Sequence, residues 1–112
     1  NYFKQKKHCL VWNVVEGVNN PMPITSNYLY VRLIGDRSIP DNQFGKIRKN
    51  KSEFIKNYAQ KLLEISDIPL AMVMANNHFE GFGPATANSL GKNFGMRELI
   101  WEEKKQKTLG NF

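Results

Sequence analysis

Two side chains capable of acid–base chemistry lie close together in one short polar stretch of the sequence. His78 and Glu80 follow the apolar run 70–75, and the amides of Asn76 and Asn77 come directly before them. Histidine and glutamate are common general acids and bases, and amide groups can orient a substrate by hydrogen bonds. The stretch therefore predicts His78 and Glu80 as catalytic residues and Asn76 and Asn77 as ligand-binding residues.

Each of these residues also has a structural interpretation, which the sequence leaves open. Asparagines such as Asn76 and Asn77 are typical turn formers. A histidine in the position of His78 is also typical of a buried, hydrogen-bonded core residue, the interpretation that we favour over catalysis. Glu80 would then have no catalytic role and would neutralise Arg32.

The helix predicted after the glycine-rich turn has an N-terminus that could assist anion binding. Pro84 suits a first helical position because its φ is fixed and its missing N–H is not needed there, and Gly91 or Gly95 can end the helix. The N–H groups of Ala85 and Thr86 would point back into the turn. An exposed helix start favours an anion by only about 0.3–1 kcal/mol. Pro84, Ala85 and Thr86 are therefore predicted to assist a phosphate site rather than to form one.

Two charged residues come from the second predicted strand. Arg32 lies near the carboxyl end of the run 28–34, on the face opposite to its aliphatic residues. If Arg32 is buried it needs an anion, because an unpaired buried charge costs roughly 3–5 kcal/mol. We predict that Arg32 binds either a ligand anion or a structural carboxylate. Asp36 follows the same strand and is a further candidate ligand-binding residue.

Several better-known motifs are matched only in part. His78 and Glu80 have the H-x-E spacing of zinc deaminases, but Cys9 is the single cysteine and cannot supply their two-cysteine element. The run 81–86 echoes the dinucleotide fingerprint, with Thr86 in place of its third glycine. A metal site formed by His78, Glu80 and Asp36 would contain one histidine and acids that are scattered along the sequence, which is weak evidence for metal binding. We predict neither a deaminase nor a dinucleotide site, assign no metal ligand, and leave metal binding and any cofactor open.

The elements that would position these residues alternate between strands and helices. The runs 8–15, 28–34 and 70–75 are predicted strands, and the first lacks clean alternation, which predicts burial on both of its faces. The segment 50–65 has apolar residues at helical spacing, and a second helix begins near residue 84. This alternation predicts parallel pairing, with the candidate residues meeting at the C-terminal ends of the strands.

The composition predicts a single α/β domain over residues 1–112, with a flexible tail at 103–112. No apolar run approaches the roughly 18 residues of a membrane helix, so no membrane contact is predicted. The lone Cys9 favours a reducing, cytoplasmic setting. The net charge is +6, which favours polyanionic partners. The basic segments 4–7, 46–51 and 104–107 support an alternative function as a nucleic-acid-binding module without catalysis.

Two motifs together resemble a known family. The segment Tyr30–Arg37 (YVRLIGDR), followed by Asn76–Ala87 (NNHFEGFGPATA), is similar to the domain-of-unknown-function 72 family, also called YecE-like. The resemblance covers the chain from about Trp12 to Gly95. Many members carry histidine at the position of Ile34, which weakens any role that needs a second histidine there.

The resemblance implies the C-terminal portion of a TIM-type (β/α)₈ barrel of roughly twice this length. Similar barrels in xylose isomerases and endonuclease-IV-like enzymes suggest sugar-phosphate or nucleic-acid chemistry, an argument from fold. Carried over by motif, Arg32, Asn77, His78 and Glu80 are rim residues. Three parallel strands cannot close a barrel, because their edges stay open. The chain is therefore expected to associate with another copy or with a missing N-terminal part of the same barrel.

Overall fold

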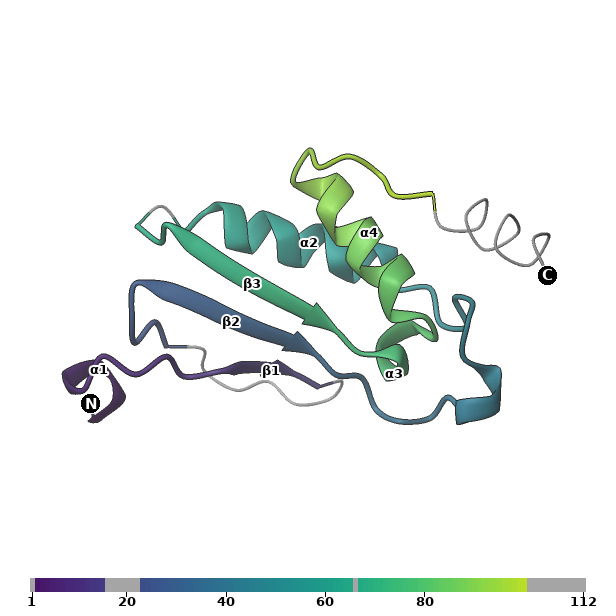
Figure 1. The fold of residues 1–112 in the computed structure, drawn as a ribbon, viewed down its shortest axis with the longest axis horizontal. Coiled ribbons are helices and arrows are strands. Elements are labelled where there is room, and N and C mark those ends of the chain that lie inside the picture. The colour runs from purple at the N-terminus through teal and green to yellow at the C-terminus, as the bar shows by residue number, and fades with distance from the viewer. Residues whose placement is uncertain (1, 16–22, 66, 101–112) are drawn as a thin grey trace, which may run out of the picture.

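The computed structural model describes residues 2–15, 23–65 and 67–100. Its helices and strands follow one another in the order α1 (Tyr2–Gln5), β1 (Trp12–Val14), β2 (Tyr28–Leu33), the 3₁₀ turn η1 (Asp41–Gln43), α2 (Ser52–Leu63), β3 (Leu70–Ala75), α3 (Asn77–Glu80) and α4 (Gly83–Asn93). Figure 1 shows α1 at one end of the molecule and the segment containing η1 at the other. The segment 101–112, which includes the predicted tail, lies outside the described residues.

The three strands form one parallel sheet in the order β1-β2-β3, which confirms the predicted mixed α/β fold. Strands β2 and β3 lie where the sequence predicts them. Strand β1 is shorter than predicted, because the Thr25 hydroxyl engages the preceding backbone: it accepts the Leu10 N–H (2.8 Å) and donates to the His8 carbonyl (2.6 Å). The predicted burial of 8–15 on both faces is wrong, since Trp12 is buried whereas its neighbours Val11 and Asn13 are exposed.

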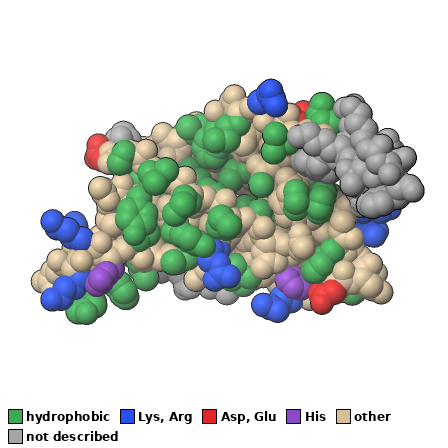
Figure 2. Space-filling model, viewed as in Figure 1, with side chains coloured by type: hydrophobic (Ala, Val, Ile, Leu, Met, Phe, Trp, Pro, Cys, Tyr) green, Lys and Arg blue, Asp and Glu red, His purple; other side chains and the backbone are tan. Residues whose placement is uncertain are grey.

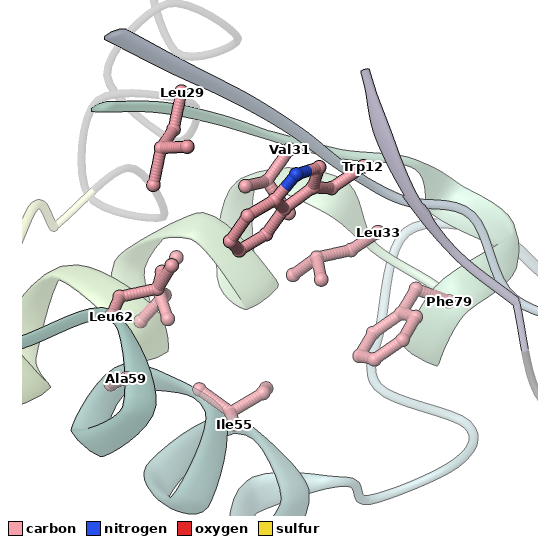
Figure 3. Close-up of a cluster of buried hydrophobic side chains, with 9 residues drawn as sticks. Trp12, Leu29, Val31, Leu33, Ile55, Ala59, Leu62 and Phe79 are labelled. Atoms are coloured by element: carbon pink, nitrogen blue, oxygen red, sulfur yellow. The ribbon is translucent and has the colours of Figure 1, made fainter. Parts of the chain in front are cut away.

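The core lies between one face of the sheet and helix α2. The period of two along β2 directs Leu29, Val31 and Leu33 to this face, as predicted, and all three are buried. Figure 3 shows these side chains facing α2, with Trp12 and Phe79 beside them. Helix α2 contributes Ile55, Ala59 and Leu62, which recur at positions i, i+4 and i+7. Burying each large aliphatic side chain stabilises the fold by about 1.5–3 kcal/mol, so this layer is the main source of stability.

The helix ends follow local rules. The Asn50 amide oxygen accepts the N–H of Ser52 (2.9 Å), the first residue of α2, in a local turn that leads into the helix, whose N-cap residue is Lys51. Helix α4 has Pro84 in its first turn and ends at Asn93, two residues before Gly95, whose φ is +77°. There the Gly95 N–H donates to the Lys92 carbonyl and the Met96 N–H to the Gly91 carbonyl, the two bonds of a Schellman motif. Gly95 therefore terminates the helix, one of the two predicted possibilities.

The second face of the sheet has no covering layer within the part of the chain that the structure describes. We call it the open face. Asn13 of β1 lies on it beside Arg32, and its other residues are Tyr28, Tyr30 and Arg32 from β2 and Leu70, Met72 and Met74 from β3. Figure 2 shows hydrophobic side chains gathered over these two strands, with charged groups mostly at the periphery. Parallel sheets are normally covered on both faces, so this arrangement is unusual. None of the helices described has the length and hydrophobicity needed to cross a membrane.

Candidate functional site

Arg32 lies at a small cavity where strands β2 and β3 end. The cavity has a volume of about 220 Å³, and its lining residues are Tyr30, Arg32, Leu33, Ile34, Met74, Ala75 and Asn76. Parallel pairing sets Arg32 beside Met74, and the Asn76 N–H donates to the Leu33 carbonyl (2.9 Å), which brings the end of β3 against the end of β2. The structure thus brings two of the predicted ligand-binding residues, Arg32 and Asn76, to one place.

The Arg32 side chain is exposed, and within residues 2–15, 23–65 and 67–100 it makes no hydrogen bond or ion pair. The structural alternative of an ion pair between Arg32 and Glu80 is therefore not formed. A guanidinium carries five N–H donors in a planar fork that matches carboxylate and phosphate oxygens. Arg32 is accordingly available to bind an anion that enters the cavity.

The amides of Asn76 and Asn77 organise the turn after β3. The Asn76 side-chain oxygen accepts the His78 N–H (2.9 Å) and caps α3, and the Asn77 side-chain oxygen accepts the Gly83 N–H (2.7 Å). Because the oxygens are fixed by these backbone donors, the NH₂ groups remain as donors for other partners. Asn76 is therefore a second donor at the cavity. Both asparagines also stabilise the turn, as their structural interpretation predicts.

The other predicted anion-binding positions do not converge on this cavity. Pro84 and Asn77 line a neighbouring cavity of about 510 Å³ beside the open edge of β3, which shares Met74, Ala75 and Asn76 with the Arg32 cavity. Ala85 lines a third, of about 580 Å³, between α2 and α4. Thr86 is 0% exposed, and its hydroxyl donates to Glu80. A phosphate bound to the first turn of α4 would have few donors available, because the Gly83 N–H is already taken by Asn77.

Glu80 is buried, with 3% of its surface exposed, and both of its carboxylate oxygens are engaged. Oε1 accepts the Thr86 hydroxyl proton (2.7 Å) and Oε2 accepts the Lys51 backbone N–H (2.9 Å). The Glu80 carbonyl also accepts the backbone N–H groups of Arg48 (2.6 Å) and Lys49 (3.0 Å). This arrangement, which we call the Glu80 clasp, joins α3, the start of α4 and the segment leading into α2. Because both oxygens are engaged, the Glu80 carboxylate is not available to transfer a proton to or from a ligand.

His78 is packed beneath the long connection between β2 and α2. Its ring meets the Phe44 ring edge-on, with the centroids 5.0 Å apart, and its Nδ1 is buried with no hydrogen-bond partner in the described residues. Gly35 (φ +83°) passes so close that an added Cβ would lie 2.4 Å from the His78 carbonyl oxygen. His78 is half-buried and packs against Phe44, and the hydrogen bond to the ring that its structural interpretation requires is not seen in the described residues.

Asp36 anchors the same connection. It forms an ion pair with Lys49 (3.0 Å) and accepts the Ser38 backbone N–H (3.0 Å). Hydrogen bonds from Ser38 and Lys49 hold the pKa of Asp36 well below its ordinary value. Since its charge is compensated locally, Asp36 serves the loop. No group of three potential metal ligands occurs among the residues described, so the structure adds no support for the metal site that the sequence left open.

The basic segments lie far apart. Figure 1 places α1, which contains Lys4, at one end of a molecule 54 Å long and the segment 46–51 towards the other, and the open face lies between them. The segment 104–107 lies outside the described residues. The two described basic segments therefore do not form one continuous patch.

Sequence reasoning missed five of the residues that line the cavity, namely Tyr30, Leu33, Ile34, Met74 and Ala75. The signal for Tyr30 was present, because it lies two residues before Arg32 on the same strand and so shares its face. Met74 required the register between β2 and β3, which only the structure supplies. Comparisons of the chain with models of protein families, with curated proteins and with solved structures find no match.

Proposed function

We propose that this chain binds a small anionic ligand, of the size and charge of a phosphate or sugar-phosphate group, at the carboxyl ends of β2 and β3. The observation that carries the proposal is the exposed guanidinium of Arg32 at a cavity that also presents the Asn76 amide. Ligand sites of parallel α/β sheets are found at this end of the strands. The volume of about 220 Å³ suits the anionic group of a ligand rather than a whole cofactor.

The proposal is one of binding, and it assigns no reaction. Glu80 is committed to the clasp, and neither Glu80 nor His78 is among the residues that line the cavity, so no acid or base is assigned there. A nucleic-acid-binding module without catalysis has less support, because the described basic segments are separated by an apolar surface.

The fold we propose for the full protein is a TIM-type barrel of the YecE-like family, of which these three strands are a portion. Three features support it: consecutive strands are neighbours in a parallel sheet, the helices that follow them pack on one face, and the other face is apolar. In such a barrel the open face would point inward and Arg32 would lie at the mouth. A cytoplasmic location, which the single cysteine favours, is part of the same proposal.

The test is binding of inorganic phosphate and of glucose 6-phosphate, measured by calorimetry and by the shift in melting temperature. A ligand at 100 times its Kd stabilises the native state by about 2.7 kcal/mol. We expect Arg32→Ala to abolish the stabilisation while leaving the melting temperature without ligand unchanged, because Arg32 is exposed. Arg97→Ala is the matched control, since Arg97 is an exposed arginine outside the cavity. Equal binding by both variants would refute the proposal.

A further inference from the structure

One polar residue near the carboxyl ends of the strands has no part in the site described above. Asn13 of β1 is paired with Arg32 of β2 in the parallel register, and its neighbours Trp12 and Val14 pack on the core side. The alternation along the strand therefore places Asn13 on the open face, beside Arg32. The Asn13 side chain is exposed and forms no hydrogen bond with any residue that the structure describes.

Asn13 completes a row of polar groups that runs across the sheet. Figure 1 shows the three strands side by side, with their carboxyl ends at the same edge. Strand β1 contributes Asn13 to this edge, β2 contributes Arg32, and Asn76 follows directly after β3. Neighbouring strands are about 4.8 Å apart, so Asn13 and Asn76 lie on the two sides of Arg32, within reach of one small molecule.

The hydrogen-bonding capacities of these three side chains differ. Arg32 offers only donors and carries the positive charge. Asn76 offers its NH₂ group, because its side-chain oxygen already accepts the His78 N–H. Asn13 keeps both its oxygen and its NH₂ group, so it can pair with a hydroxyl, which donates and accepts at once. The row is therefore suited to an anionic group that has a hydroxyl group beside it.

The lengths of the side chains indicate how large such a ligand is. An arginine side chain is longer than that of asparagine, so the Arg32 guanidinium can hold an anion farther from the sheet than the Asn13 amide reaches. A ligand that contacts both must carry its anionic group on a larger body. Tyr30 precedes Arg32 by two residues on the same face, lines the same cavity, and offers this body a flat aromatic surface with a hydroxyl at its tip. A sugar ring fits this surface, because its hydroxyls lie at its rim and its C–H groups form its faces.

We propose that the ligand is a phosphorylated sugar and that Asn13 determines this specificity. The phosphate accepts hydrogen bonds from Arg32 and Asn76, and the sugar lies over Tyr30 with one of its hydroxyls paired with Asn13. This assignment rests on the proposed function, in which Arg32 binds the anion. The site is also compatible with the proposed barrel, since these residues lie on the face that the barrel turns inward, at its mouth.

The experiment compares three ligands by calorimetry on the full-length protein: inorganic phosphate, glucose 6-phosphate and hexyl phosphate, whose alkyl chain has no hydroxyl groups. Wild type should bind glucose 6-phosphate at least about tenfold more tightly than either of the other two, because only this ligand offers hydroxyls to Asn13. Equal or tighter binding of hexyl phosphate would overturn the assignment of a sugar.

Asn13→Ala tests the residue itself. The preference for glucose 6-phosphate over inorganic phosphate should fall about three- to tenfold, which is the contribution of one neutral hydrogen bond. The melting temperature without ligand should stay the same, because the Asn13 side chain is exposed. Asn57→Ala is the matched control, since Asn57 is an exposed asparagine on α2, outside the cavity, and it should keep the preference of wild type. An undiminished preference in Asn13→Ala would overturn the role of Asn13.

Asn13→Asp tests where the residue lies. A carboxylate one strand away from Arg32 would pair with the guanidinium and repel the phosphate. Inorganic phosphate and glucose 6-phosphate should then both bind at least about threefold more weakly. Unchanged binding of inorganic phosphate by Asn13→Asp would overturn the placement of Asn13 beside the anion.

The outcomes for the sugar and for the anion site are separable. If Arg32→Ala abolishes phosphate binding and Asn13→Ala keeps the full preference for glucose 6-phosphate, the anion site stands and this inference is overturned. If phosphate binding is the same in Arg32→Ala and in wild type, the proposed function itself is overturned.

Discussion

Glu80, which the sequence predicts as a catalytic residue, is expected from the clasp to stabilise the fold rather than to act in catalysis. Its carboxylate receives two hydrogen bonds, from the Thr86 hydroxyl and the Lys51 backbone N–H, and it is almost completely buried. Hydrogen bonds to a charged group contribute about 1.5–3 kcal/mol each. Glu80→Ala removes both and leaves two donors unsatisfied, so we expect a loss of about 3–5 kcal/mol in the free energy of unfolding.

Two milder variants separate shape from charge. Glu80→Gln keeps the volume and one acceptor oxygen, and it should lose about 1–2 kcal/mol. Thr86→Val removes the hydroxyl with little change of shape and should cost a similar amount. Because the two side chains contact each other, the double variant should lose less than the sum, with a coupling energy of about 0.5–3 kcal/mol.

Urea denaturation followed by circular dichroism measures these differences directly. The midpoint should fall while the slope stays the same, because the unfolded state is unchanged. Glu80→Gln should keep the phosphate binding of wild type, since Glu80 is not among the residues that line the Arg32 cavity. A Glu80→Ala protein as stable as wild type would refute the stabilising role of the clasp. Loss of phosphate binding in a stable Glu80→Gln protein would show that Glu80 takes part in the anion site.

Three further outcomes follow from the described contacts. The Tyr58 hydroxyl is buried without a hydrogen-bond partner in the described residues, and burial raises the pKa of Tyr58 from 10.0 to about 12. The free energy of unfolding should therefore fall as the pH rises from 10 towards 12. Tyr58→Phe should remove that fall, as measured by urea denaturation at alkaline pH. The pKa of Asp36 is lowered by hydrogen bonds from Ser38 and Lys49, so these contacts stabilise the folded state above pH 3.8, and the stabilisation is lost as the pH falls through the lowered pKa. Ser38→Ala should raise the pKa of Asp36 in an NMR titration of the carboxyl groups. Gly35→Ala should cost about 2 kcal/mol or more in urea denaturation, because its φ is +83° and the new Cβ would meet the His78 carbonyl.

Local patterns were enough to predict much of the fold. The alternation along β2 placed Leu29, Val31 and Leu33 in the core, and the helical spacing between residues 50 and 65 predicted α2. The short helix α3 was missed because its four residues follow two asparagines that are good turn formers by themselves. Helix α1 was missed for a related reason, since four residues give no periodicity to detect.

The candidate site was predicted less well, because sequence order does not show on which side of a sheet a polar residue lies. Arg32 and Asn76 were placed correctly at the strand ends, where parallel strands bring them together. Glu80 was assigned to the same place by its position after β3, but the turn through α3 carries it towards α2 and α4. The Thr86 partner that fixes it is six residues away, at a spacing that matches no helix or strand rule.

The separation of Arg32 from Glu80 has a simple origin in the alternation of the strand. Leu33 must enter the core on the side of α2, so Arg32, one residue earlier, must point to the open face. Glu80 follows a turn whose next helix, α4, packs on the same side as α2. A shared pocket for the two side chains would therefore require either a one-residue shift of β2, which would expose its aliphatic residues, or the loss of the clasp. Either change would destabilise the folded state by more than an exposed ion pair stabilises it, since such pairs contribute only about 0–1 kcal/mol. The same constraint that stabilises the core thus leaves Arg32 free for an anion from outside.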